Sequence, residues 1–144
     1  MNLEIGQVLW LKVRYKTDIV ANMAHPMLVA VIDIDDNKIE VIAIDKAREK
    51  ISQLYNEANY FLDSENPKEK VIYVDSYAQL SNTLTIEFFL ELIKFRKTTA
   101  KLSKEKLTDL INDYKIYHKN NFIPDERKVH MTKNEILELN KDIG

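Results

Sequence analysis

The sequence contains no cysteine, and only two glycines and three prolines among its 144 residues. The lack of cysteine excludes disulfides, thiolate nucleophiles and zinc sites built on cysteine. No apolar run approaches the ~20 residues that a membrane-spanning helix needs, so we expect no membrane span. The three histidines, His25, His118 and His130, show no metal-ligand spacing, and we predict neither a metal nor another cofactor.

The beginning of the chain, Met-Asn-Leu-Glu-Ile-Gly, lacks the basic and then apolar pattern of a signal peptide. Together with the absence of cysteine, this favours a cytoplasmic protein. Apolar residues make up 45% of the chain and charged residues 31%, which is typical of a globular domain. The length indicates one domain plus a tail.

The formal net charge is −2, so the field of the whole molecule would not attract nucleic acid. Any site for a polyanion must therefore be local. Basic residues do cluster locally, and each cluster is either a solvated face or part of such a site. The clusters are Lys12, Arg14 and Lys16; Lys46, Arg48 and Lys50; and Lys94, Arg96, Lys97 and Lys101.

Residues 25–46 indicate two strands rich in β-branched residues, joined by a polar turn, and we expect the fold to be organised around this hairpin. The predicted strands cover 27–34 and 39–44, and the Asp-Asp-Asn between them tolerates the left-handed backbone of a hairpin turn. The turn brings His25 back toward Asp45 and Lys46. The open end of the hairpin is therefore the first place to look for chemistry.

Several other elements can be predicted around the hairpin. Residues 6–16 indicate a first strand, with an apolar face and a basic face. A short helix or a long ordered loop is expected over 46–60, and a strand over 71–75 that extends toward Leu80. Residues 86–96 are apolar almost throughout, which is typical of a helix or a strand; we expect a short helix that runs into a final strand at 95–102. The alternative is a helical hairpin over 86–117 that covers an ordinary antiparallel sheet.

Two helix starts carry clear capping signals. Ser103 is a good N-cap, and an apolar stripe from Leu107 to Tyr117 follows it at helical spacing. Thr132 and Glu135 form a capping-box pattern that opens a short helix near the end of the chain.

Three stretches together carry a family resemblance. Gly6-Gln-Val-Leu-Trp10 is similar to a Gly-Asp-Ile-Val-Trp strand, and His25-Pro-Met-Leu-Val-Ala-Val-Ile32 to an Arg-Pro-Val-Leu-Val-Ile strand. Residues 71–80 resemble an apolar strand that closes on Asp-Gln-Ile or Glu-Gln-Ile. The three patterns to which these stretches are similar are typical of the MazF/PemK group of toxin endoribonucleases. The resemblance spans about residues 5–115 in pattern.

The chain departs from the family pattern at the open end of the hairpin. His25 replaces the family arginine before proline, and Asp45 with Lys46 stands where the family has serine or threonine. A lysine–proline start and a Ser/Thr-x-Lys after the third strand resemble the related toxins neutralised by an RNA antitoxin (ToxN-like). His25-Pro26 and Lys46 are compatible with that branch.

The resemblance implies a mainly β protein with helices (α+β), a small SH3-like antiparallel barrel of the MazF/PemK/CcdB type with a C-terminal helix and a helical tail. The barrel would occupy residues 1–117, and residues 118–144 would form an extension with a short helix. The implied function is that of a toxin in a toxin–antitoxin system. Such a toxin cleaves single-stranded RNA without a metal, because the 2′-hydroxyl of the RNA attacks the adjacent phosphate and leaves a 2′,3′-cyclic phosphate. The implied partners are RNA and a cognate antitoxin of RNA or protein, with a homodimer or a toxin–antitoxin assembly expected.

The residues for this chemistry follow from the resemblance. Histidine side chains suit either proton-transfer role near neutral pH, so His25 is the expected general acid or base. Lys46 and Arg48 would hold the phosphate, with Ser52 or Ser76 as a hydrogen-bond donor to it. The RNA backbone and bases would contact Arg14, Lys16, Tyr15 and Tyr77. The competing hypothesis is a non-catalytic SH3-like barrel that binds nucleic acid or protein, in which these residues only solubilise, cap or border the core.

Overall fold

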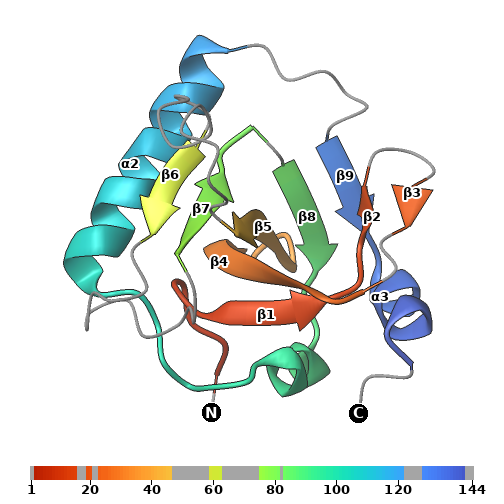
Figure 1. The fold of residues 1–144 in the computed structure, drawn as a ribbon. Coiled ribbons are helices and arrows are strands. Elements are labelled where there is room, and N and C mark those ends of the chain that lie inside the picture. Colours follow the sequence, from red (N-terminus) through yellow and green to blue (C-terminus); the bar gives the residue numbers. More distant parts are fainter. Residues whose placement is uncertain are drawn as a thin grey trace.

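A mainly antiparallel sheet forms the centre of the molecule in the computed structural model (Figure 1). The structure describes residues 2–15, 19–20, 23–46, 59–62, 75–81, 83–121 and 128–141. Five strands follow the order β1-β4-β5-β7-β6, while β8 pairs with β5 and β9 pairs with β8. The strands are β1 (Val8–Leu11), β4 (His25–Asp33), β5 (Lys38–Lys46), β6 (Asn59–Leu62), β7 (Ser76–Gln79), β8 (Thr83–Glu87) and β9 (Lys128–Met131).

The remaining elements lie around this sheet. A separate short pair consists of β2 (Arg14–Tyr15) and β3 (Ile19–Val20). The helices are the 3₁₀ helix η2 (Leu90–Phe95), α2 (Lys104–Asn120) and α3 (Lys133–Leu139). The expected class, mainly β with helices, is confirmed. No helix among the described residues is long and apolar enough to cross a membrane.

The predicted hairpin is confirmed as the pair β4 and β5. Asn37 has a φ of 53°, so the left-handed backbone falls in the expected turn. Both strands are longer than predicted, and both carry apolar residues on each of their faces. Continuous apolar runs of this kind are typical of strands that are covered on both sides.

Two core clusters cover the two faces of the hairpin. The first core cluster contains Met27 and Val29 of β4 and is closed by β8, η2, β9 and α3. The second core cluster contains Leu28 and Ala30 of β4 and is closed by β6, β7 and α2. Figure 1 shows α2 beside β6 and β7, and α3 at the opposite side of the sheet beside β9. The hairpin is therefore the shared wall of both clusters.

The first strand was predicted to have one apolar and one basic face. This is wrong for residues 8–11, the part that pairs with β4. Leu9 and Leu11 lie in the first core cluster and Val8 in the second, because β1 lies beside β4 and is covered on both sides. The strand ends at Leu11; Lys12 belongs to the connection that follows and Arg14 to β2.

The prediction for residues 86–102 is also wrong in its detail. β8 ends at Glu87, and the helix expected after it is a 3₁₀ helix that buries Leu92 and Phe95. No strand covers 97–102, and Arg96 alone forms an isolated bridge, to Leu9. The alternative of a helical hairpin over 86–117 is wrong as well, since residues 86–87 belong to β8, and η2 and α2 close different core clusters.

The two predicted helix starts are confirmed. The Ser103 hydroxyl accepts a hydrogen bond from the backbone N–H of Lys106 at 3.3 Å, and α2 buries Leu110 and Tyr114. Thr132 and Glu135 form the reciprocal capping box of α3. The strand that precedes α3, β9, was not expected; it pairs in parallel with β8. Residues 128–141 therefore complete the sheet and the first core cluster.

Two further expectations meet the structure only in part. The helix or loop predicted over 46–60 lies mostly outside the described residues, and its end is instead strand β6, from Asn59. Residues 71–74 are outside the described residues, but the expected extension of that strand is present as β7.

Candidate functional site at the open end of the hairpin

His25 and Asp45 lie at the end of the hairpin opposite its turn. The last registered pair of β4 and β5 there is Met27 with Ala43, and each candidate residue stands two positions beyond it. Because side chains alternate along a strand, His25 shares a face with Met27, and Asp45 shares that same face with Ala43. The hairpin thus places an imidazole and a carboxylate on one face of the sheet.

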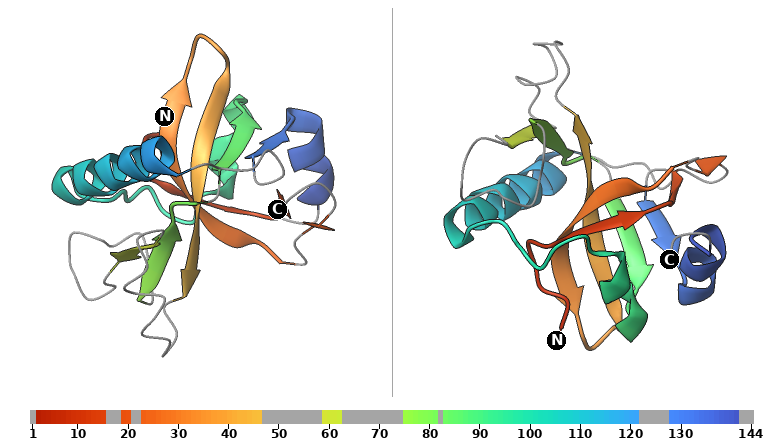
Figure 2. Two further views of the ribbon diagram at one scale, coloured as in Figure 1. Left: turned by 90° about the horizontal axis from the view of Figure 1, so that it is seen from above. Right: turned by 60° about the horizontal axis from the view of Figure 1, so that its bottom comes forward.

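Beyond that pair the two strands take different neighbours. His25 pairs with Leu11 of β1, whereas Asp45 pairs with Tyr77 of β7. Figure 2 shows β4 and β5 side by side near the turn and pointing apart at the other end. His25 therefore lies at the expected end of the hairpin. Its strand neighbour there is β1, whereas the neighbour of Asp45 is β7.

Asp45 is the residue that the sequence interpretation named without giving it a role. Its exposed carboxylate accepts a hydrogen bond from the Tyr77 hydroxyl at 3.3 Å. Both residues have additional partners within the chain. This contact depends on the pairing of β5 with β7, which no local pattern in the sequence indicates.

Tyr77 cannot serve as a platform for a base. Only 5% of its surface is exposed, so its ring has no open face on which a base could stack. Its hydroxyl donates to the Asp45 carboxylate, and the burial of the ring disfavours the expected stacking role.

Ser76 is unsuited to the expected contact with a phosphate for a similar reason. It is 4% exposed and stands in the middle of three strands, opposite Lys46 of β5 and Leu62 of β6. A hydroxyl in that position belongs to the wall of the second core cluster. The expectation that it donates to the scissile phosphate stays a prediction, and this burial disfavours it.

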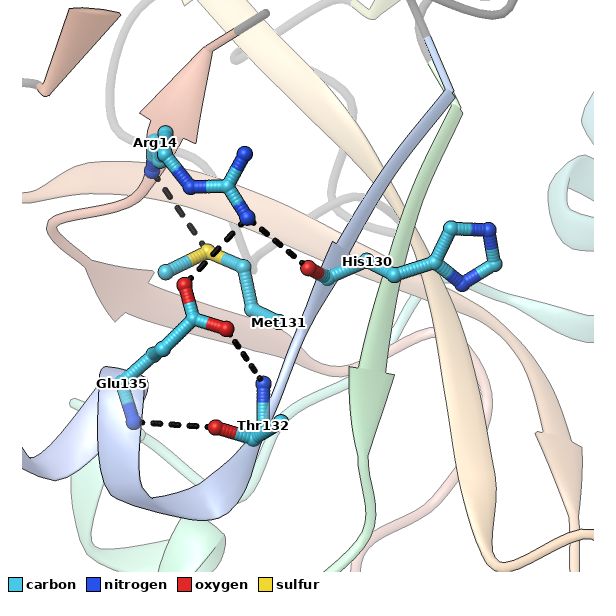
Figure 3. Close-up of polar contacts among 5 residues, drawn as sticks. All are labelled: Arg14, His130, Met131, Thr132 and Glu135. Carbon is cyan, nitrogen blue, oxygen red and sulfur yellow. Dashed lines mark hydrogen bonds and ion pairs between the residues drawn. The ribbon is translucent and has the colours of Figure 1, made fainter. Parts of the chain in front are cut away.

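Arg14, an expected RNA contact, forms polar contacts within the chain. Its Nη2 donates to the backbone oxygen of His130 at 3.0 Å and to Oε2 of Glu135 at 3.2 Å (Figure 3). The backbone N–H of Arg14 points to Sδ of Met131 at 3.5 Å. The guanidinium thus attaches β2 to β9 and α3, and its side chain is 25% exposed. The ring of His130 extends away from this cluster.

The structure gives little or no side-chain information for the remaining predicted residues. Lys16, Arg48 and Ser52 lie outside the described residues. For Tyr15 and Lys46 the structure describes the backbone, which places Tyr15 in β2 and Lys46 at the end of β5.

The basic cluster of residues 94–101 binds partners within the protein. Arg96 donates to the side-chain oxygen of Gln7 at 3.1 Å, and Lys97 lies 3.8 Å from the ring centre of Trp10. Lys101 forms an ion pair with Glu4 at 3.0 Å. These contacts favour the interpretation of this cluster as a structural surface.

His118 has a structural contact as well. Its Nε2 lies 2.7 Å from the backbone oxygen of Leu80, which requires the tautomer with the proton on Nε2. Tyr114 and Tyr117 border the ring, with ring centres 4.3 Å and 5.9 Å away. The contact joins α2 to the end of β7.

Within the described part of the chain, no group of three histidine, aspartate or glutamate residues is arranged to hold a metal ion. No known family model matches the chain, and a search of curated proteins finds no match.

Proposed function

We propose that this chain is a metal-independent endoribonuclease, a toxin of the MazF/PemK-like group, that cleaves single-stranded RNA. The observation that carries the proposal is the common face of His25 and Asp45, each two residues beyond the Met27–Ala43 pair. One group donates a proton readily and the other accepts one, and both stand at the end of a rigid hairpin. As a toxin, the protein would be held inactive in the cytoplasm by a cognate antitoxin of RNA or protein.

The two groups supply the base and the acid that are needed to transfer the phosphoryl group to the 2′-hydroxyl. The Asp45 carboxylate removes the 2′-hydroxyl proton while that oxygen forms a bond to phosphorus. The bond from phosphorus to the 5′ oxygen breaks, and a protonated His25 gives its proton to the departing oxygen. The products are a 2′,3′-cyclic phosphate and a 5′-hydroxyl. Lys46, the next residue after Asp45, is proposed to offset the charge on the phosphorane.

The pairing of β5 supports the proposal of an SH3-like barrel. One half of β5 pairs with β4 and β8, and its other end pairs with β7. A strand that changes partners along its length bends the sheet around itself, as a small barrel requires. The tight covering of this strand on both faces is consistent with such a barrel.

The test compares wild type with His25→Ala and Asp45→Asn on a mixed single-stranded RNA in the presence of EDTA. His130→Ala is the matched control, because it removes an exposed histidine outside the candidate site. We expect cyclic-phosphate ends from wild type and the control, and a loss of about 100-fold or more with either site variant. Expression of wild type should be toxic, and His25→Ala should relieve that toxicity.

Cleavage that persists in both site variants would contradict the assignment of the site. Intact RNA with wild type would contradict catalysis itself.

A second function, a non-catalytic barrel that binds nucleic acid or protein, has one observation in its favour. Ser76 and Tyr77 are buried and Arg14 is attached to Glu135, so three expected substrate contacts serve the fold. Binding of the same RNA without cleavage, measured by fluorescence anisotropy in EDTA, would select this function.

A further inference from the structure

A groove of about 430 Å³ lies between β4 and α2, and its volume is within the range of sites that bind small molecules. Most of its apolar lining comes from residues of the second core cluster or residues packed against it, namely Ala30, Val31, Leu107 and Ile111. The rest of the lining consists of Ile5, Ile32, Thr108, Asn112 and Lys115. The groove is therefore an opening onto the apolar interior.

The groove follows the axis of α2. Leu107 lies at one end, where its Cδ2 is 3.1 Å from the position that a Cβ on Gly6 would take, so Ile5 belongs to this end. Lys115 lies about two turns further along the same side of the helix. Eight residues of α-helix span about 12 Å. The groove thus has an apolar end and a cationic end, about 12 Å apart.

The cationic end carries hydrogen-bond donors without a neighbouring acid. Lys115 is exposed, and it forms no ion pair within the part of the chain that the structure describes. The exposed Asn112, one turn earlier on the same side of α2, offers the donors of its amide. The described residues that line the groove include no aspartate or glutamate. A carboxylate is a head group that fits this end.

The β4 wall of the groove is unsuited to another strand. Among the described residues, no strand pairs with Val31–Asp33 on the side of β1 and Ile5. However, the register of β4 shifts between Val29 and Val31, as at a β-bulge. Bulges interrupt regular pairing and protect an open edge from strand addition. A hydrocarbon chain, which needs no backbone hydrogen bonds, therefore fits this wall better than an extended peptide does.

We propose that the groove binds a free medium-chain fatty acid. The hydrocarbon chain lies along the apolar lining and ends near Ile5, and the carboxylate pairs with Nζ of Lys115. Affinity comes mainly from the methylene groups that leave water, and the lysine sets the orientation of the ligand. The groove lies on the half of β4 next to the turn, away from His25 and Asp45. This inference is therefore independent of the proposed RNA cleavage.

The first test titrates the full chain with octanoate at neutral pH and follows the backbone amides by NMR. We expect the amide signals of residues 30–32 and 107–115 to shift. The affinity should rise about two- to fourfold per methylene from hexanoate to decanoate. It should stop rising once the chain is longer than the groove. No binding, or shifts that leave both of these segments unchanged, would overturn the proposal.

Lys115→Gln tests the contact with the head group. We expect this variant to bind octanoate about fivefold more weakly. Its affinity for octanol, which has the same chain without the charge, should be unchanged. Lys119→Gln is the matched control, because Lys119 is exposed one turn later on α2 and does not line the groove. An equal loss for octanoate and octanol, or an equal loss in both variants, would overturn the assignment of Lys115.

Thr108→Trp tests the groove itself. Thr108 is an exposed residue of the lining, and a large ring at this position should block both octanoate and octanol. The control is Ile116→Trp, because Ile116 is 57% exposed on α2 and lies outside the lining. This control should bind both ligands as wild type does. Equal octanoate affinity in the two tryptophan variants would overturn the proposal, because the ligand would then bind elsewhere on the protein.

Discussion

At the residue scale, Tyr77 has two functions that one substitution separates. Its ring is packed in the protein and its hydroxyl donates to Asp45. Tyr77→Phe keeps the ring, so we expect a loss of only about 0.5–1.5 kcal/mol in the free energy of unfolding, measured by denaturant titration. If Asp45 is the base, the rate of RNA cleavage should fall as well, because the hydroxyl no longer orients the carboxylate.

Tyr117→Phe is the control for this prediction, because Tyr117 packs beside the second core cluster at a distance in sequence from the hairpin. A cleavage rate that falls equally in both variants, or in neither, would show that the Tyr77 hydroxyl does not orient the base.

The individual site residues were predictable only where their placement is local. His25 follows from the hairpin, whose two strands and turn lie within one continuous stretch. Arg14 does not, because its partners are 116 and 121 residues away in the sequence. Alternation along residues 76–80 reveals a strand, but it cannot say that Tyr77 faces the protein interior beside Asp45. Burial is a property of the assembled sheet.

At the scale of elements, α2 carries a local electrostatic penalty. Burial raises the pKa of Asp113 above its ordinary value, and the Asp109 carboxylate one turn earlier raises it further. A raised pKa in the folded state means that ionised Asp113 disfavours folding at neutral pH. The penalty disappears as the pH falls through the folded-state pKa, because the group then becomes neutral.

Asp113→Asn should therefore stabilise the protein at neutral pH by about 0.2–0.5 kcal/mol, the size of a like-charge pair one turn apart on a helix. The gain should vanish in acid, where wild-type Asp113 is protonated. Thermal unfolding at several pH values measures both effects. Glu91→Gln is the control and should bring no gain, since the Glu91 carboxylate faces Lys133 at 4.0 Å. An Asp113→Asn gain that does not change with pH would contradict this explanation.

Elements with self-contained signals were predictable from the sequence, and elements that need a distant partner were not. Ser103 and Thr132 begin helices through hydrogen bonds to residues three positions away, so their capping patterns identify both starts. β9 is a strand only because β8 lies beside it in parallel. Residues 97–102 have strand-like composition in part, yet no strand among the described residues is aligned with them.

At the scale of the whole molecule, the two ends of the described chain are joined by one buried side chain. The Asn140 side chain accepts from the Lys12 N–H at 2.7 Å and donates to the Lys12 oxygen at 3.0 Å. It is 2% exposed and also donates to the Ile136 oxygen, which ends α3. Residues 128–141 thus share the stability of the sheet that they complete.

Asn140→Ala should lower the free energy of unfolding of the whole sheet by about 1–3 kcal/mol, because it removes the two hydrogen bonds that the buried Asn140 side chain forms with the Lys12 backbone. The single tryptophan, Trp10, lies on β1 against the second core cluster, so its fluorescence reports on the body of the protein. The exposed residue Asn120 provides the control Asn120→Ala, which should change little. If residues 128–141 were an independent extension, the tryptophan transition would be the same in Asn140→Ala and wild type. A lowered midpoint with one transition instead means that the C-terminal strand and helix unfold together with the hairpin.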